Sequence, residues 1–207
     1  MDASDLQAQT RKAHAFKALH ERAQVFVIPN PWDAGSAKML ASLGYQALAT
    51  TSAGYAFSQG KADGALSLEE TLANVRAIVA ATDLPVAVDL ENGFSDDPTE
   101  SAKSLLRAAE AGAGGGSIED ATGRPDAPIY CFEHAVARIE AAVAAVRTLP
   151  FPFILTARAE NYLHGNPDLD DTIRRLKAFA DAGADVLYAP GVRNAEEVLA
   201  VVHAVAP

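Results

Sequence analysis

The hydrophobic pattern of this chain repeats. An Ala-rich amphipathic stretch ends at a glycine and passes into a short apolar run three times, at residues 39–49, 108–118 and 179–188. A glycine just past a helix provides the left-handed C-cap, so each segment predicts a helix, a glycine stop and a strand. Two further apolar runs, residues 84–89 and 151–156, lie between these segments and supply the alternate strands.

An additional apolar run at residues 25–28 brings the number of predicted strands to six, near residues 25, 47, 86, 116, 153 and 186. Apolar strands that alternate with helices predict a parallel sheet covered by helices. Polar residues recur at the C-terminal end of nearly every strand. This favours a (β/α)8 TIM-barrel type of α/β fold over an open doubly wound sheet, because a barrel gathers its chemistry around one axis.

The length of the chain limits the number of domains and of βα units. The 207 residues suffice for one well-buried domain, whereas a full barrel typically takes about 250 residues. We therefore expect residues 1–207 to form a single barrel domain of about six βα units that lacks the last two. The helix-like segment 6–22 precedes the first strand, and we expect it to cover the bottom or side of the barrel.

Composition and charge exclude several classes of protein. A formal charge of −10 argues against nonspecific binding to nucleic acid or to an anionic membrane. No apolar run approaches the length of a membrane span, and the start of the chain lacks the pattern of an export signal. The single cysteine, Cys131, cannot form an internal disulfide and fits a reducing compartment. We expect a cytoplasmic protein with no nucleic-acid or membrane partner.

Acidic residues follow two neighbouring predicted strands. Asp89 and Glu91 lie at the end of the third strand, and alternation along an extended strand places both on the same side. Glu119 ends the fourth strand, and Asp63 lies in the loop after the second. Carboxylates that converge in this way can hold a hard cation such as Mg²⁺, which prefers oxygen ligands. The alternative is that each acid caps a helix or faces solvent.

Other polar residues at the strand ends are candidates for substrate binding. Arg158 ends the fifth strand, where its guanidinium could bind a carboxylate, a phosphonate or an enolate oxygen; it could instead pair with one of the acids. The turn of Thr51, Ser52 and Ala53 offers hydroxyl and backbone N–H donors, or is an ordinary polar turn. Trp32 follows the first strand and could line the pocket.

Two further signals do not indicate catalysis. The glycine-rich run 112–116 follows a helix and precedes a strand, which is the reverse of the order in a dinucleotide-binding loop. It is better interpreted as a tight turn between a helix and a strand. Cys131 has His134 three residues further on, but nothing else in the sequence indicates an activated thiolate.

Taken in order, these motifs resemble the isocitrate lyase and phosphoenolpyruvate mutase superfamily. The resemblance runs from about Val25 to Tyr188 and depends on the ordered set rather than on any single motif. The set consists of Asn30-Pro31-Trp32-Asp33, Thr51-Ser52-Ala53, Gly60 to Asp63, Asp89-x-Glu91, Ser117-Ile118-Glu119-Asp120 and Ala157-Arg158.

The resemblance implies a barrel that binds Mg²⁺ and a small 2-oxo or 2-hydroxy carboxylic acid. Such an enzyme makes or breaks a C–C or P–C bond through a metal-stabilised enolate. Homo-oligomers are also implied. The family's metal-binding acids correspond to Asp63, Asp89, Glu91 and Glu119, its catalytic and substrate-binding groups to Arg158 and Glu119, and its anion-binding turn to Thr51 and Ser52.

The loop after the fourth predicted strand departs from the family pattern. Isocitrate and methylisocitrate lyases carry a Lys-Lys/Arg-Cys-Gly-His sequence there, whereas this chain has residues 121–128, which contain no cysteine. The Lys and Asn of the mutases are missing from the same loop, as is a His after the sixth strand. We therefore expect a divergent lyase-type member. The alternatives are a phosphonopyruvate-type hydrolase or mutase, and a non-catalytic truncated barrel that acts as an oligomer or interaction partner.

Overall fold

Local signals in the sequence define where the helices begin and end. Asp33, Ser67 and Asp97 each accept a backbone N–H of the first turn of the helix that follows. Three helices are followed by a glycine in the left-handed region, with φ of 88° at Gly44, 100° at Gly112 and 102° at Gly183. The predicted order of helix, glycine and strand is therefore confirmed at all three positions.

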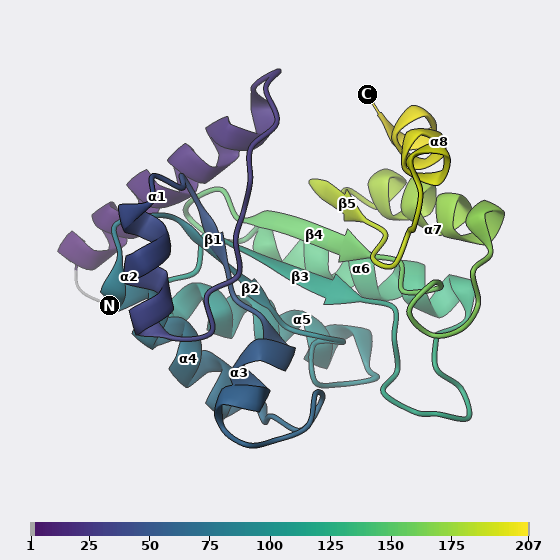
Figure 1. The fold of residues 1–207 in the computed structure, drawn as a ribbon, viewed down its shortest axis with the longest axis horizontal. Coiled ribbons are helices and arrows are strands. Elements are labelled where there is room, and N and C mark those ends of the chain that lie inside the picture. The colour runs from purple at the N-terminus through teal and green to yellow at the C-terminus, as the bar shows by residue number, and fades with distance from the viewer. Residues whose placement is uncertain (1–2, 207) are drawn as a thin grey trace.

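A computed structural model describes residues 3–206 of the chain (Figure 1). Its elements run in the order α1 (Ala3–Glu21), α2 (Ala34–Ser42), β1 (Leu48–Ala49), α3 (Ser52–Ser58), α4 (Leu68–Ala81), β2 (Val86–Asp89), α5 (Pro98–Glu110), β3 (Gly115–Glu119), α6 (Phe132–Val146), β4 (Ile154–Arg158), α7 (Leu169–Asp181), β5 (Val186–Tyr188) and α8 (Ala195–Val205).

The five strands form one parallel sheet in the order β1-β2-β3-β4-β5. Each strand lies beside the next one in the sequence, as in a (β/α) barrel. The sheet does not close, because β1 and β5 remain at opposite edges. Figure 1 shows α1 and α2 at one end of the sheet and α7 and α8 at the other, with an opening between them. The fold is therefore a parallel half-barrel.

The prediction of six strands is wrong by one among the described residues. Residues 25–28 are extended but do not belong to the sheet. A single backbone hydrogen bond joins this region to the sheet among the described residues, from the Ala49 N–H to the Pro29 carbonyl, at 3.1 Å. Val25 is 96% exposed, so no strand packs on its outer side. A single backbone bond does not make a ladder, so this segment is not a strand of the sheet.

Helix α1 closes the bottom of the sheet, as the sequence predicts for residues 6–22. The Gln9 side chain donates to the carbonyls of Ala109 (2.7 Å) and Ala113 (3.0 Å), just before β3. Phe16 is 2% exposed and lies so close to Gly115 that a Cβ there would come within 2.8 Å of its ring. The residues of the glycine-rich run therefore have to be small, because α1 and β4 pack directly against β3.

No helix within residues 3–206 is both long enough and apolar enough to cross a lipid bilayer.

The packing of α1 gives a first prediction. Replacing buried Phe16 by Ala should lower the free energy of unfolding by about 3–5 kcal/mol, because it removes a large apolar side chain and leaves a cavity. Phe57→Ala is the matched control, since Phe57 is 56% exposed, and it should cost less than about 1 kcal/mol. Urea unfolding followed by circular dichroism measures both changes. If both variants lost the same free energy of unfolding, the packing of α1 against the sheet would not contribute to stability as proposed.

Candidate active site

Four neighbouring strands bring polar side chains together at their C-terminal ends. Ser52 follows β1, Asp89 ends β2, Glu119 ends β3 and Arg158 ends β4. The register of the sheet places Glu119 directly beside Arg158. Because all strands run in parallel, these ends lie on one edge of the sheet, which is where barrel enzymes carry their active sites.

Arg158 is the centre of this group. Its guanidinium lies 3.0 Å from the Asp89 carboxylate, 3.2 Å from that of Glu119 and 2.8 Å from that of Glu160. The side chain is only 16% exposed, and its guanidinium lies 5.6 Å from the centre of the Tyr188 ring on β5. Three acids from three segments therefore share a single cation.

Asp89 is held by groups from the neighbouring strand end. The backbone N–H and hydroxyl of Ser52 both donate to its second oxygen, at 3.1 and 2.8 Å. Its own backbone N–H donates to the Thr50 hydroxyl at 3.0 Å. With Arg158 on the first oxygen, the carboxylate of Asp89 has partners at both oxygens.

Glu91 reaches the site by a turn rather than by strand alternation. Strand β2 ends at Asp89, and Glu91 adopts the left-handed conformation with φ of 51°. Its backbone N–H donates to the Asp89 carboxylate at 3.2 Å. One side-chain oxygen, Oε1, is buried and has no hydrogen-bond partner. A strained backbone that presents an unpartnered carboxylate oxygen is typical of a functional position.

Burial and crowding raise the pKa of these acids. Desolvation, followed by repulsion from Asp89 and Asp63, raises the pKa of Glu91 to about 7. Desolvation raises the pKa of Glu119 to about 8, although the charge of Arg158 acts in the opposite direction. The pKa of Glu160 is raised by the same burial. One guanidinium therefore does not compensate the negative charge gathered here.

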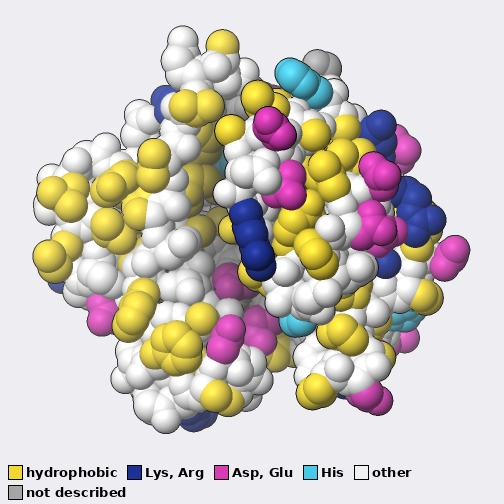
Figure 2. All heavy atoms as spheres, turned by 45° about the vertical axis from the view of Figure 1, so that its right-hand side comes forward, with side chains coloured by type: hydrophobic (Ala, Val, Ile, Leu, Met, Phe, Trp, Pro, Cys, Tyr) yellow, Lys and Arg dark blue, Asp and Glu magenta, His cyan; other side chains and the backbone are white. Residues whose placement is uncertain are grey.

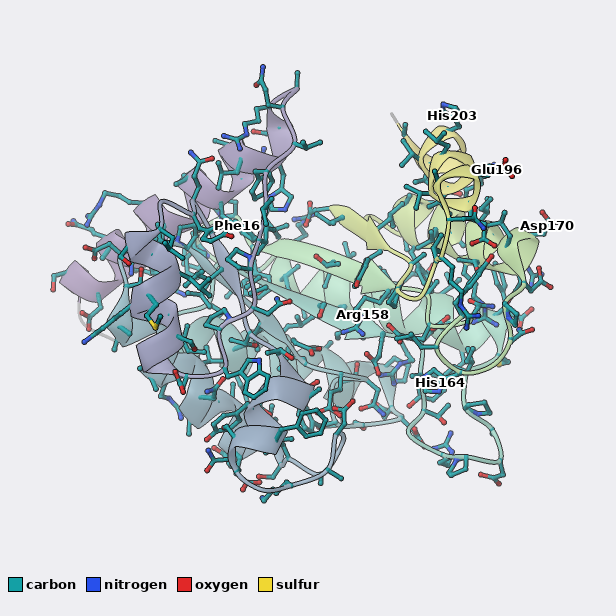
Figure 3. All side chains as sticks on the ribbon, viewed as in Figure 1. Phe16, Arg158, His164, Asp170, Glu196 and His203 are labelled. Carbon is teal, nitrogen blue, oxygen red and sulfur yellow. The ribbon has the colours of Figure 1, made fainter. Side chains whose placement is uncertain are left out.

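These groups line a cavity of about 590 Å³. In Figure 2 a hollow separates the two sides of the molecule, with acidic side chains on its floor and apolar side chains on both walls. Figure 3 shows Arg158 on the open side of the sheet and His164 in the loop that follows β4. The lining residues are Ser52, Asp63, Gly64, Leu66, Glu91, Asn92, Phe94, Glu119, Ala121, Thr122, Gly123, Arg158, Glu160, Leu163 and His164.

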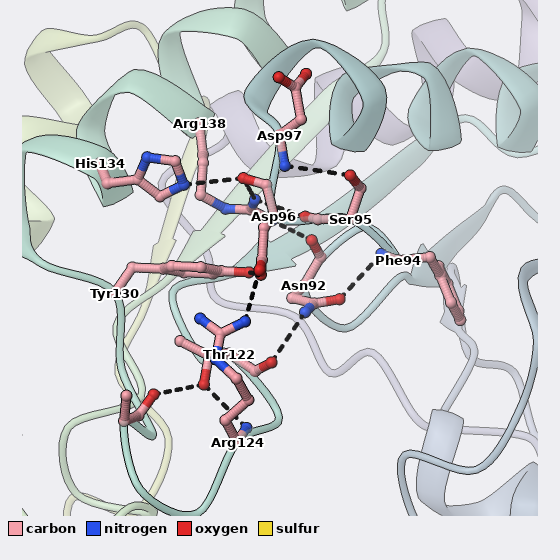
Figure 4. A network of polar contacts seen from close by, with 11 residues as sticks. Asn92, Phe94, Ser95, Asp96, Asp97, Thr122, Arg124, Tyr130, His134 and Arg138 are labelled. Atoms are coloured by element: carbon pink, nitrogen blue, oxygen red, sulfur yellow. Dashed lines mark hydrogen bonds and ion pairs between the residues drawn. The ribbon is translucent and has the colours of Figure 1, made fainter.

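A polar network fixes the loop that covers this cavity between β3 and α6 (Figure 4). Asp96 accepts from Arg124 at 2.6 Å and from the Tyr130 hydroxyl, and its carbonyl contacts His134 at 2.8 Å. Arg138 is 1% exposed and donates to the carbonyls of the β2–α5 loop. The residues that stand where the lyases carry their cysteine sequence are thus bound to the preceding loop.

Comparison with known proteins identifies the family. The family model described as phosphoenolpyruvate phosphomutase matches residues 16–207. The chain belongs to this family. The resemblance to the isocitrate lyase and phosphoenolpyruvate mutase superfamily is therefore confirmed.

Relatives within the superfamily catalyse several reactions. The chain is 34% identical to the 2-methylisocitrate lyase of Salmonella typhimurium over 84% of this chain and 60% of that enzyme. It is 29% identical to the oxaloacetate decarboxylase of Paraburkholderia xenovorans over 95% of this chain and 67% of that enzyme. The chain thus spans about two thirds of the length of these curated relatives.

Crystal structures of relatives show the same fold. One is a Burkholderia cenocepacia protein classed as a lyase or mutase, with a TM-score of 0.95 and 62% identity over 96% of this chain and 72% of that one. Another is a phosphonopyruvate hydrolase in complex with oxalate and Mg²⁺, with a TM-score of 0.85 and 25% identity over 93% of this chain and 68% of that one.

In this member of the phosphomutase family, the predicted site residues divide into two groups. Asp63, Glu91, Glu119, Arg158 and Ser52 line the cavity, and Asp89 contacts three of them. The other three predicted residues lie outside the cavity lining. The Thr51 hydroxyl caps α3 by accepting the Gly54 N–H at 3.1 Å, Ala53 belongs to the first turn of α3, and Trp32 packs against Gly54.

Sequence patterns did not single out several other lining residues. His164 and Leu163 lie in the loop after β4, Phe94 follows β2, and Leu66 precedes α4. The only signal for them is their position in loops after strands, where barrel enzymes place their ligand contacts. That signal is shared by many residues and cannot select these four.

The raised pKa of Glu119 predicts how stability depends on pH. In the folded protein Glu119 keeps its proton up to a pKa of about 8, compared with an ordinary value of 4.5. Between these values the folded state binds more protons than the unfolded state, so the free energy of unfolding falls as the pH rises through this window. Glu119→Gln should flatten this fall in the metal-free protein, and urea unfolding across the window measures it.

The control for this prediction is Glu100→Gln. Glu100 is exposed and pairs with Lys103 at 2.6 Å, remote from the cavity. Its replacement should leave the pH dependence of the free energy of unfolding unchanged. If the free energy of unfolding of the Glu119→Gln variant fell with pH as steeply as that of the unmodified protein, the buried position of this acid would be contradicted.

Proposed function

We propose that this protein is a Mg²⁺-dependent lyase-type enzyme that makes or breaks a C–C or P–C bond in a small 2-oxo or 2-hydroxy carboxylic acid through an enolate. The observation that carries the proposal is the unpartnered buried Oε1 of Glu91 beside Arg158. A buried carboxylate oxygen that gains no hydrogen bond from the protein is suited to bind a cation from outside.

The acids of the cavity fit Mg²⁺. Among the described residues, no three acidic, histidine or cysteine side chains are already arranged as a complete metal cage. Mg²⁺ does not require one, because it usually takes one or two protein carboxylates and completes its shell with water and substrate oxygens. Glu91 is the principal candidate ligand. Asp63 and Glu119 also line the cavity, and the charges of Asp89 and Asp63 raise the pKa of Glu91.

When bound, Mg²⁺ supplies a Lewis acid that stabilises negative charge on substrate oxygens. The relative crystallised with oxalate and Mg²⁺ is consistent with a cation and a small carboxylate at a site of this kind.

Arg158 is suited to bind the substrate carboxylate. A guanidinium has five N–H donors, and the three ion pairs with Asp89, Glu119 and Glu160 leave donors free at the cavity surface. The ion pairs also fix the plane of the guanidinium before the substrate arrives, which lowers the entropic cost of binding. The alternative role of Arg158 as an ion-pair partner and its substrate-binding role are therefore compatible.

Glu119 is suited to supply a proton. Its pKa of about 8 keeps a large fraction of the side chain protonated near neutral pH. Glu119, Glu160 and Ser52 all line the cavity. A protonated carboxyl beside a developing carbanion can donate to carbon, which is the step that an enolate requires.

Two alternatives remain distinct proposals. A phosphonopyruvate-type hydrolase or mutase would use the same cation and arginine for a P–C bond. A non-catalytic interaction partner would use its exposed apolar side chains, of which Val25 and Tyr188 lie at the two open edges of the half-barrel. A screen of 2-oxo and 2-hydroxy acids together with phosphonopyruvate separates these functions, since a non-catalytic protein turns over none of them. A homo-oligomer remains compatible with all three.

The metal assignment predicts the effect of Glu91→Gln. The amide keeps the shape of the side chain but loses its charge, so the variant should need at least about 10-fold more Mg²⁺ for half-maximal turnover. Glu69→Gln is the matched control, because Glu69 is 65% exposed and pairs with Arg107 outside the cavity. Turnover in the screen, measured against Mg²⁺ concentration, gives the result. Equal Mg²⁺ requirements in both variants would show that Glu91 does not bind the metal.

A further inference from the structure

The cavity carries very little positive charge of its own. Of its lining residues, four are acids and one, Arg158, is a permanent cation. Arg158 has donors to bind one carboxylate of a substrate. A second anionic group on the same substrate would need a second cation, or it would lie among the acids that line the cavity.

Four other basic residues that follow or face the strand ends are engaged in contacts outside the cavity lining. Lys61 pairs with Glu70, and Arg124 pairs with Asp96 on the outer side of its loop. Arg175 is 9% exposed and binds Asp120 at 3.0 Å. Arg138 is buried among backbone carbonyls. None of these four side chains lines the cavity.

Apolar side chains form part of the cavity wall. Leu66, Phe94 and Leu163 come from three different loops and all line the cavity. Leu163 is 56% exposed, although exposure of a large aliphatic side chain in a loop normally carries a cost. An uncharged, partly apolar group of a ligand would cover these side chains. A charged group would lose its hydration against them without gaining a partner.

We propose that the substrate carries a single carboxylate, next to its 2-oxo group, and an uncharged distal group that packs on Leu66, Phe94 and Leu163. The site then discriminates against di- and tricarboxylates and against phosphonates. This inference rests on the proposed function, because it takes the 2-oxo acid head group and the Mg²⁺ requirement from it. Discrimination arises because Arg158 is the one permanent cation among the described lining residues and already shares its charge with three acids.

His164 is the one other lining residue that can carry a positive charge. It lies exposed at the rim of the cavity, in the loop after β4 (Figure 3). Binding of a second carboxylate by a protonated His164 is the competing interpretation, and it makes a different prediction for a His164 variant.

The test is isothermal titration calorimetry of the full chain in the presence of Mg²⁺. The ligands are oxalate, as a head-group probe, and two 2-oxo acids of equal chain length, 2-oxopentanoate and 2-oxoglutarate, which differ only in a terminal methyl or carboxylate. We expect oxalate and 2-oxopentanoate to bind, and 2-oxoglutarate to bind at least about 10-fold more weakly than 2-oxopentanoate.

A charge placed on the apolar wall should reverse this preference. Leu163→Lys adds a cation beside the distal group, so 2-oxoglutarate should then bind more tightly than 2-oxopentanoate. Leu199→Lys is the matched control, since Leu199 is 52% exposed on α8 and does not line the cavity. The control should keep the preference of the unmodified protein.

The possible outcomes separate the two levels of the proposal. Tighter binding of 2-oxoglutarate to the unmodified protein overturns the single-carboxylate inference and leaves the proposed function standing. If the His164→Gln variant then no longer bound 2-oxoglutarate more tightly, His164 would be the residue that binds the second carboxylate. Absence of Mg²⁺-dependent binding for oxalate and for both 2-oxo acids overturns the proposed function and the inference together.

Discussion

The site depends on one guanidinium that is shared by three buried acids. Arg158 holds Asp89, Glu119 and Glu160 from three segments in fixed positions, and Ser52 completes the contacts of Asp89. Breaking such a buried group by removing one partner leaves an uncompensated charge, which is strongly unfavourable. The arrangement is nevertheless too acidic to be balanced internally. Burial, together with the crowding of the acids, raises the pKa of Glu91 and Glu119, and the acidic lining makes the cavity a suitable place for an added cation.

Much of the fold could be predicted from the sequence because it depends on local signals. Glycine caps and apolar runs identified five strands and the helices between them, since both signals act within a few residues. Residues 25–28 carry the same apolar signal but form no ladder with β1, and pairing is not a local property. The closure of the sheet is likewise decided by contacts between distant segments rather than by the pattern of any one of them.

The site was predictable only in part. Strand ends indicated Asp89, Glu119 and Arg158 correctly as neighbours, because parallel strands bring their C-terminal ends to one edge. The turn that presents Glu91 was not predictable from alternation, since its backbone leaves the strand with a positive φ. The apolar wall of the cavity comes from three loops, and loop positions follow from tertiary contacts such as the Asp96 network (Figure 4).

The most direct test of this account is a crystal structure with Mn²⁺ in place of Mg²⁺ and with oxalate, in which anomalous scattering locates the metal. The account predicts one metal peak in the cavity, within coordination distance of Glu91, with oxalate between the metal and Arg158. A metal bound elsewhere on the surface, or a cavity that takes up oxalate without metal, would contradict it.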